Sequence, residues 1–429
     1  MTTITEQPVA TEKFSSRAKD FTAHWKVSIA LGIFAIVGLI VFVAFGRDGD
    51  STFVLSTAND FIQLPNIVLP SRVAGIVFEL LLIGGFAGSI YYIRKNRPTP
   101  LWLIALFAVV FLVGFLSWAA AGQLPIPVPG LLIGAVAGAV PLVFGALGGV
   151  ISERSGVVNV AIEGQLLAGA FVSALVASAT QQPILGLFAA MIAGVLVSFV
   201  LAAFAIKYVV DQVIVGVVLN VLVAGITNFL YSTVLSPNLD TLNSPPRFER
   251  IEIPLLSQIP IVGPVLFRQT IIVYVAYFAV ALVWYGLFKT RWGLRMRAVG
   301  EHPKAADTVG INVNRTRFWN VSLAGAIAGF GGAFFTLGSV GGFTKEMTAG
   351  AGFIALAAVI FGRWDPIKAT LAALLFGFAT NLQSVLSIIG SPVPSEFMLM
   401  LPYVVTIFAV AGFVGQSRAP AASGKAYIK

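Results

Sequence analysis

Long apolar runs separated by short polar stretches make up most of this chain. A helix needs about 20 consecutive apolar residues to cross the hydrocarbon core of a bilayer. Twelve candidate runs can be read between polar or turn-forming boundaries, at about 27–45, 74–93, 101–121, 131–150, 161–180, 184–206, 212–235, 269–288, 318–340, 349–362, 367–389 and 397–415. The pattern predicts an all-α, polytopic transmembrane helical bundle of about twelve spans, one of them short or re-entrant.

The composition supports a lipid environment and excludes several classes of site. Hydrophobic residues are 58% of the chain and charged residues only 10%, whereas about 25% of the residues of soluble domains are charged. So few charges cannot cover a water-exposed surface of this size, so lipid must surround most of it. Cysteine is absent and the two histidines, His24 and His302, are far apart. We therefore expect no disulfide and no metal site.

The basic residues are distributed unequally between the two sides of the predicted membrane. If the N-terminus is cytoplasmic, 21 of the 27 Lys and Arg residues fall on cytoplasmic segments and 6 on the outer side. The acidic residues split evenly, 8 and 8, with Glu79 and Glu163 inside spans. A bias in basic residues alone is the positive-inside rule. It predicts a cell-membrane protein with both termini cytoplasmic, and it explains the net charge of +9 without nucleic acid.

The chain divides into four regions by composition. Residues 1–26 are a polar, cytoplasmic N-terminal tail, 27–121 an additional three-span region, 131–415 a nine-span core, and 416–429 a cytoplasmic C-terminal tail. Prolines at 125, 127 and 129 mark the break between the second and third regions. Lipid anchoring or subunit packing is the simplest interpretation of the three extra spans.

The run at 349–362 is too short for an ordinary span and is expected to be a half-helix or re-entrant segment. We nevertheless count it as crossing. If it did not cross, the three basic residues of the C-terminal tail would lie outside, against the positive-inside rule.

The largest polar interruption on the predicted inner side is 289–317, with seven basic residues. Pro303 to Val309 reads as a short helix closed by Gly310. Its adjacent Ala305 and Ala306 would give a small, smooth surface that could dock on another protein, although a solvated basic loop is an equal alternative. The segment resembles the Ala-Ala-x-x-x-Gly signature of ABC importer permeases. Lys304 stands where that signature has Glu, and Glu301 lies three residues earlier.

A second segment, ALGGVISERSGVVNVAIEGQLLAGAF at 146–171, resembles the signature of nucleoside-type permeases within the branched-chain amino acid, simple sugar and nucleoside permease group. The motif of that group is E-R-[SA]-G-x-x-N-[IV]-x-x-E-G. All of its fixed positions are present, namely Glu153, Arg154, Gly156, Asn159, Glu163 and Gly164. The resemblance covers about 131–415.

Physical chemistry suggests a role for each polar residue of this motif. Arg154 at the inner surface can neutralise a carboxylate or bind lipid phosphate, and Gly156 allows a sharp turn. Asn159 is placed to cap the next helix, with Glu163 favoured by that helix's dipole. Glu163 either pairs with Arg154 and holds two spans together, or acts as a gate near the inner side.

Four amides lie in otherwise apolar spans: Asn220, Asn228, Asn381 and Gln383. Such groups either join helices by hydrogen bonds or line a path for a polar solute. Gly325, Gly329 and Gly332 form a small helix face that allows close packing. Polar breaks follow two Gly-rich spans, one on each predicted side, which favours an inverted repeat.

The chain has no G-x-x-x-x-G-K-[ST] stretch, so it cannot hydrolyse ATP by that route. The resemblance implies a non-enzymatic transmembrane subunit of an ABC importer that binds no cofactor itself. Its implied partners are a cytoplasmic ABC ATPase that binds ATP and Mg²⁺, a second homologous permease, an extracytoplasmic substrate-binding protein and the lipid bilayer.

The sequence leaves other functions open. Nucleosides are the favoured substrate by resemblance, with branched-chain amino acids or simple sugars as alternatives. An ion-coupled secondary carrier would need an acid near the midplane, and Glu163 is expected nearer the inner side. A membrane-embedded enzyme would need paired acids, a metal cluster or an activated nucleophile, and the spans contain none in recognisable spacing.

Overall fold

The computed structural model describes residues 11–394, 396–397, 400 and 418–428; for 11–24 it describes only the helical backbone. The chain forms two compact units. The first comprises residues 1–55, 64–127 and 385–398, and the second 56–63, 128–384 and 399–429.

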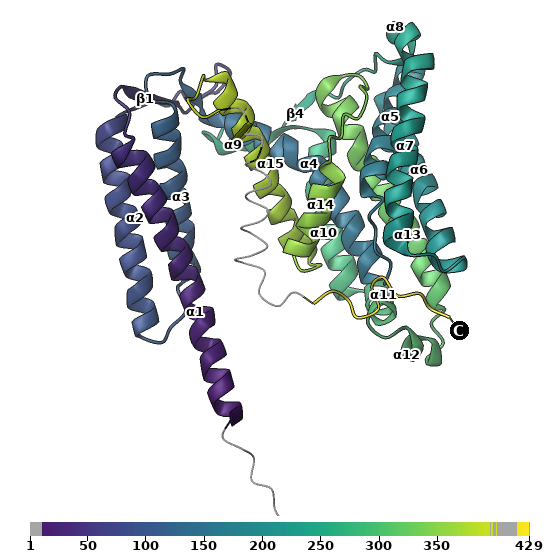
Figure 1. Ribbon diagram of the computed structural model, residues 1–429. Helices are drawn as coiled ribbons and strands as arrows, with labels where there is room; N and C mark the ends of the chain where they lie inside the picture. Colours follow the sequence, from purple (N-terminus) through teal and green to yellow (C-terminus); the bar gives the residue numbers. More distant parts are fainter. Residues whose placement is uncertain (1–10, 395, 398–399, 401–417, 429) are drawn as a thin grey trace, which may run out of the picture. The chain divides into compact units, whose positions relative to one another are not determined.

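The first unit is a three-helix bundle with a small sheet at one end (Figure 1). Its helices are α1 (Thr11–Gly38), continued by the π-helical turn η1 (Leu39–Ala44), α2 (Ser71–Arg94) and α3 (Leu101–Ala119). Strand β1 (Asp50–Val54) pairs antiparallel with β2 (Ile67–Pro70) and parallel with β3 (Ile126–Pro127). In register, Phe53 faces Ile67 on one side and Ile126 on the other.

Phe42 forms the centre of this bundle. It is 1% exposed and packs with Leu31, Leu82 and Phe107. A Cβ atom at Gly75 would lie 2.8 Å from the Phe42 backbone oxygen, so only glycine allows α2 to approach this closely.

The second unit contains the remaining helices, apart from residues 385–388 at the end of the last helix, which fall in the first unit. Its elements are α4 (Val128–Arg154), α5 (Ile162–Thr180), α6 (Pro183–Ala202), η2 (Ala203–Lys207), α7 (Gln212–Leu230), η3 (Tyr231–Leu235), η4 (Ser236–Asn238), α8 (Leu239–Leu242), β4 (Arg250–Glu252), η5 (Leu256–Gln258), α9 (Val262–Leu266), β5 (Arg268–Thr270), α10 (Ile271–Lys289), α11 (Arg291–Glu301), α12 (Pro303–Thr308), α13 (Val313–Ala333), η6 (Phe334–Val340), α14 (Ala351–Phe361) and α15 (Pro366–Ile388). Most of the second unit is therefore helical, as its apolar runs predict.

Three helices, α4, α5 and α13, form the buried centre of this unit, because about 70% of each apolar window is covered by other helices. The glycine face of α13 produces the closest packing. A Cβ at Gly329 would collide with the Ala190 backbone of α6, and one at Gly332 with the Leu166 backbone of α5. The small face expected from the sequence therefore lies between helices.

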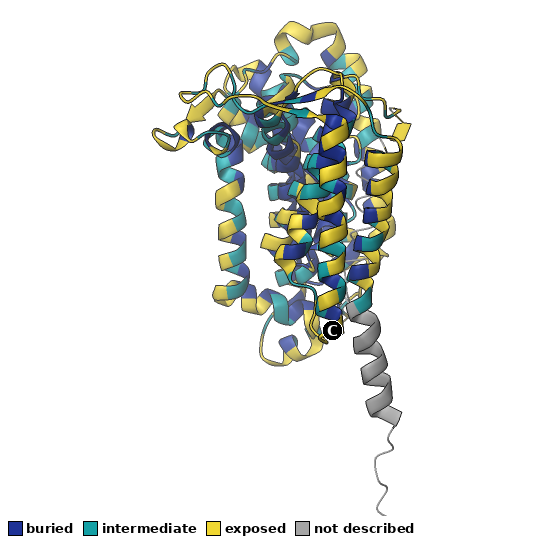
Figure 2. Cartoon of the chain, turned by 90° about the vertical axis from the view of Figure 1, so that its left-hand side faces the viewer, coloured by how far each residue is buried: buried dark blue, intermediate teal, exposed yellow. Residues whose placement is uncertain are grey.

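The outer helices expose apolar rather than polar surface. On α7, exposed side chains include Val221, Leu222, Ile226 and Phe229, and Figure 2 shows exposed residues running in strips along the long helices. Within the described residues, ten helices are long and apolar enough to cross a membrane. The all-α polytopic bundle is confirmed, because such surfaces are stable only against lipid.

The two remaining expected spans have different outcomes. Helix α14 has 11 residues, about 16 Å at 1.5 Å per residue, which is roughly half of the hydrocarbon core. It is the half-helix that the short run suggested, and a crossing at this place would also require the non-helical residues 341–350. The run at 397–415 lies outside the described residues except for 397 and 400.

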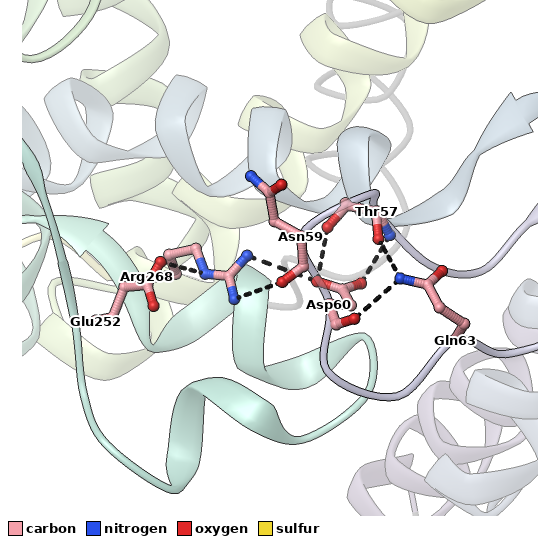
Figure 3. Close-up of polar contacts among 6 residues, drawn as sticks. All are labelled: Thr57, Asn59, Asp60, Gln63, Glu252 and Arg268. Atoms are coloured by element: carbon pink, nitrogen blue, oxygen red, sulfur yellow. Dashed lines mark hydrogen bonds and ion pairs between the residues drawn. The ribbon is translucent and has the colours of Figure 1, made fainter.

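Residues 56–63 form a network of polar contacts with β4 and β5 in the second unit (Figure 3). Arg268 lies 3.6 Å from the Asp60 carboxylate and 3.0 Å from that of Glu252. The backbone N–H and the hydroxyl of Thr57 both donate to Asp60. Arg268 therefore joins this loop to the two-stranded sheet, in which Glu252 and Arg268 are paired in register.

Candidate functional site: two interrupted helices

The first break in the helices, residues 155–161, follows the end of α4 at Arg154. Gly156 has φ +96°, a conformation that other residues rarely adopt. A Cβ there would also lie 2.7 Å from the Arg317 guanidinium. The sharp turn predicted from Gly156 is confirmed, and it has a second cause in this close approach.

Asn159 does not cap the helix that follows, contrary to expectation. The N-cap residue of α5 is Ala161, without a side-chain cap. The fully buried Asn159 amide instead forms two hydrogen bonds with the Gln165 amide, which also donates to Ser198. A buried amide pair satisfies both partners better than one cap bond, because each has donors and an acceptor to satisfy.

The second break, residues 341–350, lies at the opposite end of the unit. It follows η6, which continues α13, whereas the first break follows α4. Gly341 and Gly350 have φ values of +83° and +84°. The Asn243 side chain donates to the Phe343 carbonyl and accepts from its N–H. Two breaks on opposite sides, each after a long Gly-containing helix, are the arrangement that an inverted repeat requires.

The helices that follow the two breaks meet at the carboxylate of Glu163. One oxygen accepts hydrogen bonds from the Thr348 hydroxyl (2.6 Å) and the Gly350 N–H (2.9 Å). The other accepts from the Gly352 N–H (2.6 Å). Glu163 lies in the first turn of α5. The first turn of α14 has no acidic residue of its own, and the Glu163 carboxylate takes that place.

This junction is deeper in the helix bundle than the sequence suggested. Helix α14 extends from Glu163 to the end of the unit where Trp364 contacts Arg154, a distance of about 16 Å. That is roughly half of a 30 Å hydrocarbon core. Residues 155–161 re-enter the bundle before α5 begins, so Glu163 lies within the bundle rather than at the end of α4.

One alternative from the sequence was a pair between Glu163 and Arg154. The structure does not contain this pair. The Arg154 Nε donates to the Trp364 carbonyl instead. The Glu163 carboxylate is satisfied by three donors, two of them on the first residues of α14. The N-termini of two helices, α5 and α14, therefore meet at this one side chain.

Most of the amides join helices. Asn220 of α7 accepts from the Gly164 N–H and donates to the Val160 carbonyl, so it satisfies backbone groups freed by the first break. Asn381 of α15 donates to the Leu131 carbonyl of α4. These contacts favour the joining role over the path-lining role for both residues.

Asn228 and Gln383 are the amides that stay available for a path. Asn228 donates to Glu346 in the second break, and its buried oxygen has no partner among the described atoms. Gln383 is half-buried on α15. A free acceptor beside a break, in an otherwise apolar region, is what a polar solute could use.

Glu153, Arg154 and Trp364 meet at the end of the unit that carries the loop 289–317. The Trp364 indole N–H donates to the buried Glu153 carboxylate (2.6 Å). A Cβ at Gly300 of α11 would collide with the Arg154 carbonyl. The signature motif and the loop 289–317 are therefore in direct backbone contact.

The loop forms helices α11 and α12, and α12 presents one side to solvent. Lys304, Ala305 and Gly310 are exposed. Ala306 is only 3% exposed and packs with Val299 and Val313, so its side chain does not lie on the exposed side of α12. A six-residue helix next to the bundle must bury one face, and a small residue allows it to lie close. Glu301 is exposed and accepts a hydrogen bond from the Ala421 N–H.

Sequence reasoning missed Thr348, Gly350, Gly352, Trp364 and Arg317. Thr348 and the two glycines precede and open an apolar run, which is a signal for a helix start that could have been read. Trp364 and Arg317 carry no local signal, because their partners lie far away along the chain.

Residues 131–410 match the family described as the branched-chain amino acid transport system / permease component. This match covers more than half of the chain and includes both breaks and the loop 289–317. The chain belongs to this permease family. Residues 1–130 lie outside the match.

The chain is also similar to individual permeases. It is 45% identical over 306 residues to the guanosine ABC transporter permease protein NupQ of Bacillus subtilis, covering 68% of this chain and 94% of that protein. It is 42% identical over 304 residues to the nucleoside ABC transporter permease protein NupC of Lactococcus lactis, covering 67% and 93%. The guanosine ABC transporter permease protein NupP of B. subtilis is 28% identical over 279 residues, covering 64% and 79%. No solved structure matches the chain significantly.

Family membership makes this permease a multi-pass membrane subunit of an ABC transporter, whose ATPase is a separate chain, and not an enzyme itself. This confirms the resemblance inferred from the residues. Within the described residues, no group of three or more His, Cys, Asp or Glu could hold a metal ion.

Proposed function

We propose that this permease forms the translocation path of an ABC importer for nucleosides. The observation that supports nucleosides as the substrate is the identity of this chain to two permeases, 45% to one named for guanosine and 42% to one named for nucleosides. The chain covers nearly the whole length of both permeases. The complete E-R-S-G-V-V-N-V-A-I-E-G segment supports the same class. Branched-chain amino acids or simple sugars are the runner-up substrates, because the family is named for the former.

The proposed assembly needs three partners. A cytoplasmic ABC ATPase, which binds ATP and Mg²⁺, docks on the exposed side of α12. A second, homologous permease completes the path; the existence of two B. subtilis guanosine permeases similar to this chain supports a heterodimer. An extracytoplasmic binding protein delivers the substrate. The permease lies in the cell membrane with both termini cytoplasmic; the uneven distribution of basic residues supports this orientation.

A movement of α12 can be transmitted to the translocation path through only a few contacts. Helix α11, which precedes α12, packs against the Arg154 backbone through Gly300. Arg154 begins the first break, which leads to the Glu163 junction. A displacement of the docking loop by the ATPase therefore reaches the helix breaks through packed backbone, which transmits strain well.

The test is uptake by proteoliposomes that contain the permease, its second permease and the ATPase. Added binding protein and internal ATP should drive accumulation of labelled guanosine, with no accumulation of leucine or glucose. ATP-dependent leucine or glucose uptake without guanosine uptake would overturn the substrate.

One observation favours a second candidate, an ion-coupled carrier. The acid at Glu163 lies near the middle of the helix bundle, where such carriers keep their coupling residues. The same liposomes distinguish the two, because a carrier would accumulate guanosine in a proton or sodium gradient without ATP.

A further inference from the structure

The described part of the C-terminal tail, residues 418–428, crosses the docking loop. In Figure 1 it is the yellow segment that runs past α11 to the C-terminus. The Ala422 N–H donates to the Gly300 carbonyl, and the Ala421 N–H donates to the Glu301 carboxylate. Ala422 is only 4% exposed. The segment is therefore seated on α11 by backbone hydrogen bonds.

The same segment contacts the docking helix α12. The Tyr427 hydroxyl is hydrogen-bonded to the Asp307 carboxylate, and the Tyr427 ring packs at the cluster that contains Ala306 and Val313. Desolvation and the negative charge of Asp307 raise the pKa of the Tyr427 hydroxyl. Tyr427 therefore stays protonated, and a hydrogen-bond donor to Asp307, at neutral pH.

On its other side the segment contacts the first helix break through Arg317. The Arg317 Nη1 donates to the Lys425 carbonyl (2.8 Å), and the same guanidinium lies against Gly156 of the signature motif. Gly424 approaches Val158, with 3.5 Å between an added Cβ and the Val158 side chain. One side chain of α13 thus connects the break to the C-terminal tail.

Arg317 depends strongly on this contact. It is 2% exposed, and its Nε and Nη2 have no hydrogen-bond partner among the described residues. A buried guanidinium with unsatisfied donors is costly, and loss of its remaining acceptor raises the cost further. The position of Lys425 and the position of Arg317 are therefore energetically coupled.

We propose that residues 418–428 and Arg317 form a coupling strap that links the ATPase-docking helix to the first helix break. The strap holds α12 by Tyr427 and holds the break by Arg317, so a displacement of one end moves the other. This inference rests on the proposed function and names residues that relay ATPase movement to the path. Arg317 acts as a positioning residue and touches no substrate.

The test measures nucleoside transported per ATP hydrolysed in the reconstituted full complex. A chain that ends at Ser417 and the variant Arg317→Met should keep the ATPase bound and hydrolysing. Both should transport about tenfold less nucleoside per ATP, the size typical of a coupling between sites. Tyr427→Phe, which removes only the Asp307 hydrogen bond, should lower the ratio less. Arg317→Lys keeps the charge and should partly restore it.

The control is Ile428→Ala, a change within the strap at a side chain that is 74% exposed; the ratio should not change. An unchanged ratio in the truncated chain would overturn the strap. Loss of the bound ATPase from the truncated chain would also overturn it, because the segment would then belong to the docking surface. The wild-type arm tests the proposed function separately: if it transports no nucleoside, the proposed function fails.

Discussion

At the scale of single residues, one carboxylate determines how two helices begin. Glu163 accepts three hydrogen bonds from 348–352 while it belongs to the first turn of another helix. Its negative charge suits both helix N-termini. Glu153 and Arg154 of the signature motif also contact the second region, through Trp364, but Glu163 is the motif residue that bonds the start of α14.

Glu163→Gln should weaken this junction. The amide keeps the size of the side chain but presents N–H donors where the oxygens accepted bonds. At least one backbone N–H of the α14 start then loses its acceptor, which costs about 1–3 kcal/mol. Thermal unfolding of the purified permease should shift to lower temperature and nucleoside uptake should fall. Glu163→Asp, which keeps the charge, should lie between; equal stability of wild type and Glu163→Gln would contradict the junction.

Substitutions at two neighbouring alanines should distinguish an effect on ATPase docking from an effect on the stability of the permease. Ala305 is exposed and Ala306 is 3% exposed. Ala305→Trp should release the ATPase in co-purification while the permease keeps its thermal stability. Ala306→Trp should destabilise the permease itself, because the cluster with Val299 has no room for the larger ring. Retention of the ATPase by Ala305→Trp would place the docking surface elsewhere.

The residues of the site were more predictable than their contacts. The spacing of Glu153, Gly156 and Glu163 identified the segment, and the left-handed turn at Gly156 was foreseeable from the residue type. The partners of Asn159 and Glu163 were not, because they are Gln165 and a segment about 185 residues away along the chain. Local patterns predict local structure, whereas side-chain partners depend on which helices pack together.

At the scale of elements, the starts of α5 and α14 are in close backbone contact. A Cβ at Gly352 would collide with the Glu163 backbone. Gly352→Ala should therefore force α14 away from α5 and break the bonds to the Glu163 carboxylate. We expect a clear loss of thermal stability and of uptake.

The matched control is Gly225→Ala on α7, where no atom lies within 4 Å of an added Cβ. That change should be neutral or stabilise the helix by up to about 1 kcal/mol, because alanine is the better helix former. If Gly352→Ala were as stable as Gly225→Ala, the two helix starts would not be in contact.

Apolar run length predicted the long helices well and the interrupted ones poorly. A run of about 20 apolar residues forms a continuous helix in lipid, because the helix satisfies all of its backbone hydrogen-bonding groups. Residues 155–161 and 341–350 leave the helix inside the bundle, where Asn220 and Asn243 satisfy the freed backbone groups. Such a break is stable only because of distant side chains, so run length alone cannot locate its depth.

At the scale of the whole molecule, the uneven distribution of basic residues predicts which end of the second unit faces the cytoplasm. Thr308, on the docking helix, and Thr241, on the short helix α8 before β4, are both exposed. They lie at opposite ends of α13 and η6, because α13 begins just after the docking loop and η6 ends where Asn243 bonds Phe343. The positive-inside rule places Thr308 in the cytoplasm and Thr241 outside.

The chain contains no cysteine, so single cysteines report this orientation without a background. A membrane-impermeant maleimide added to intact cells should label Thr241→Cys and leave Thr308→Cys unlabelled. After the membrane is opened, both should react, because both positions are exposed to water in the structure. The two variants change the same residue type, so a difference in labelling reports sidedness rather than chemistry. Labelling of Thr308→Cys from outside would invert the permease and place the docking helix beyond the reach of a cytoplasmic ATPase.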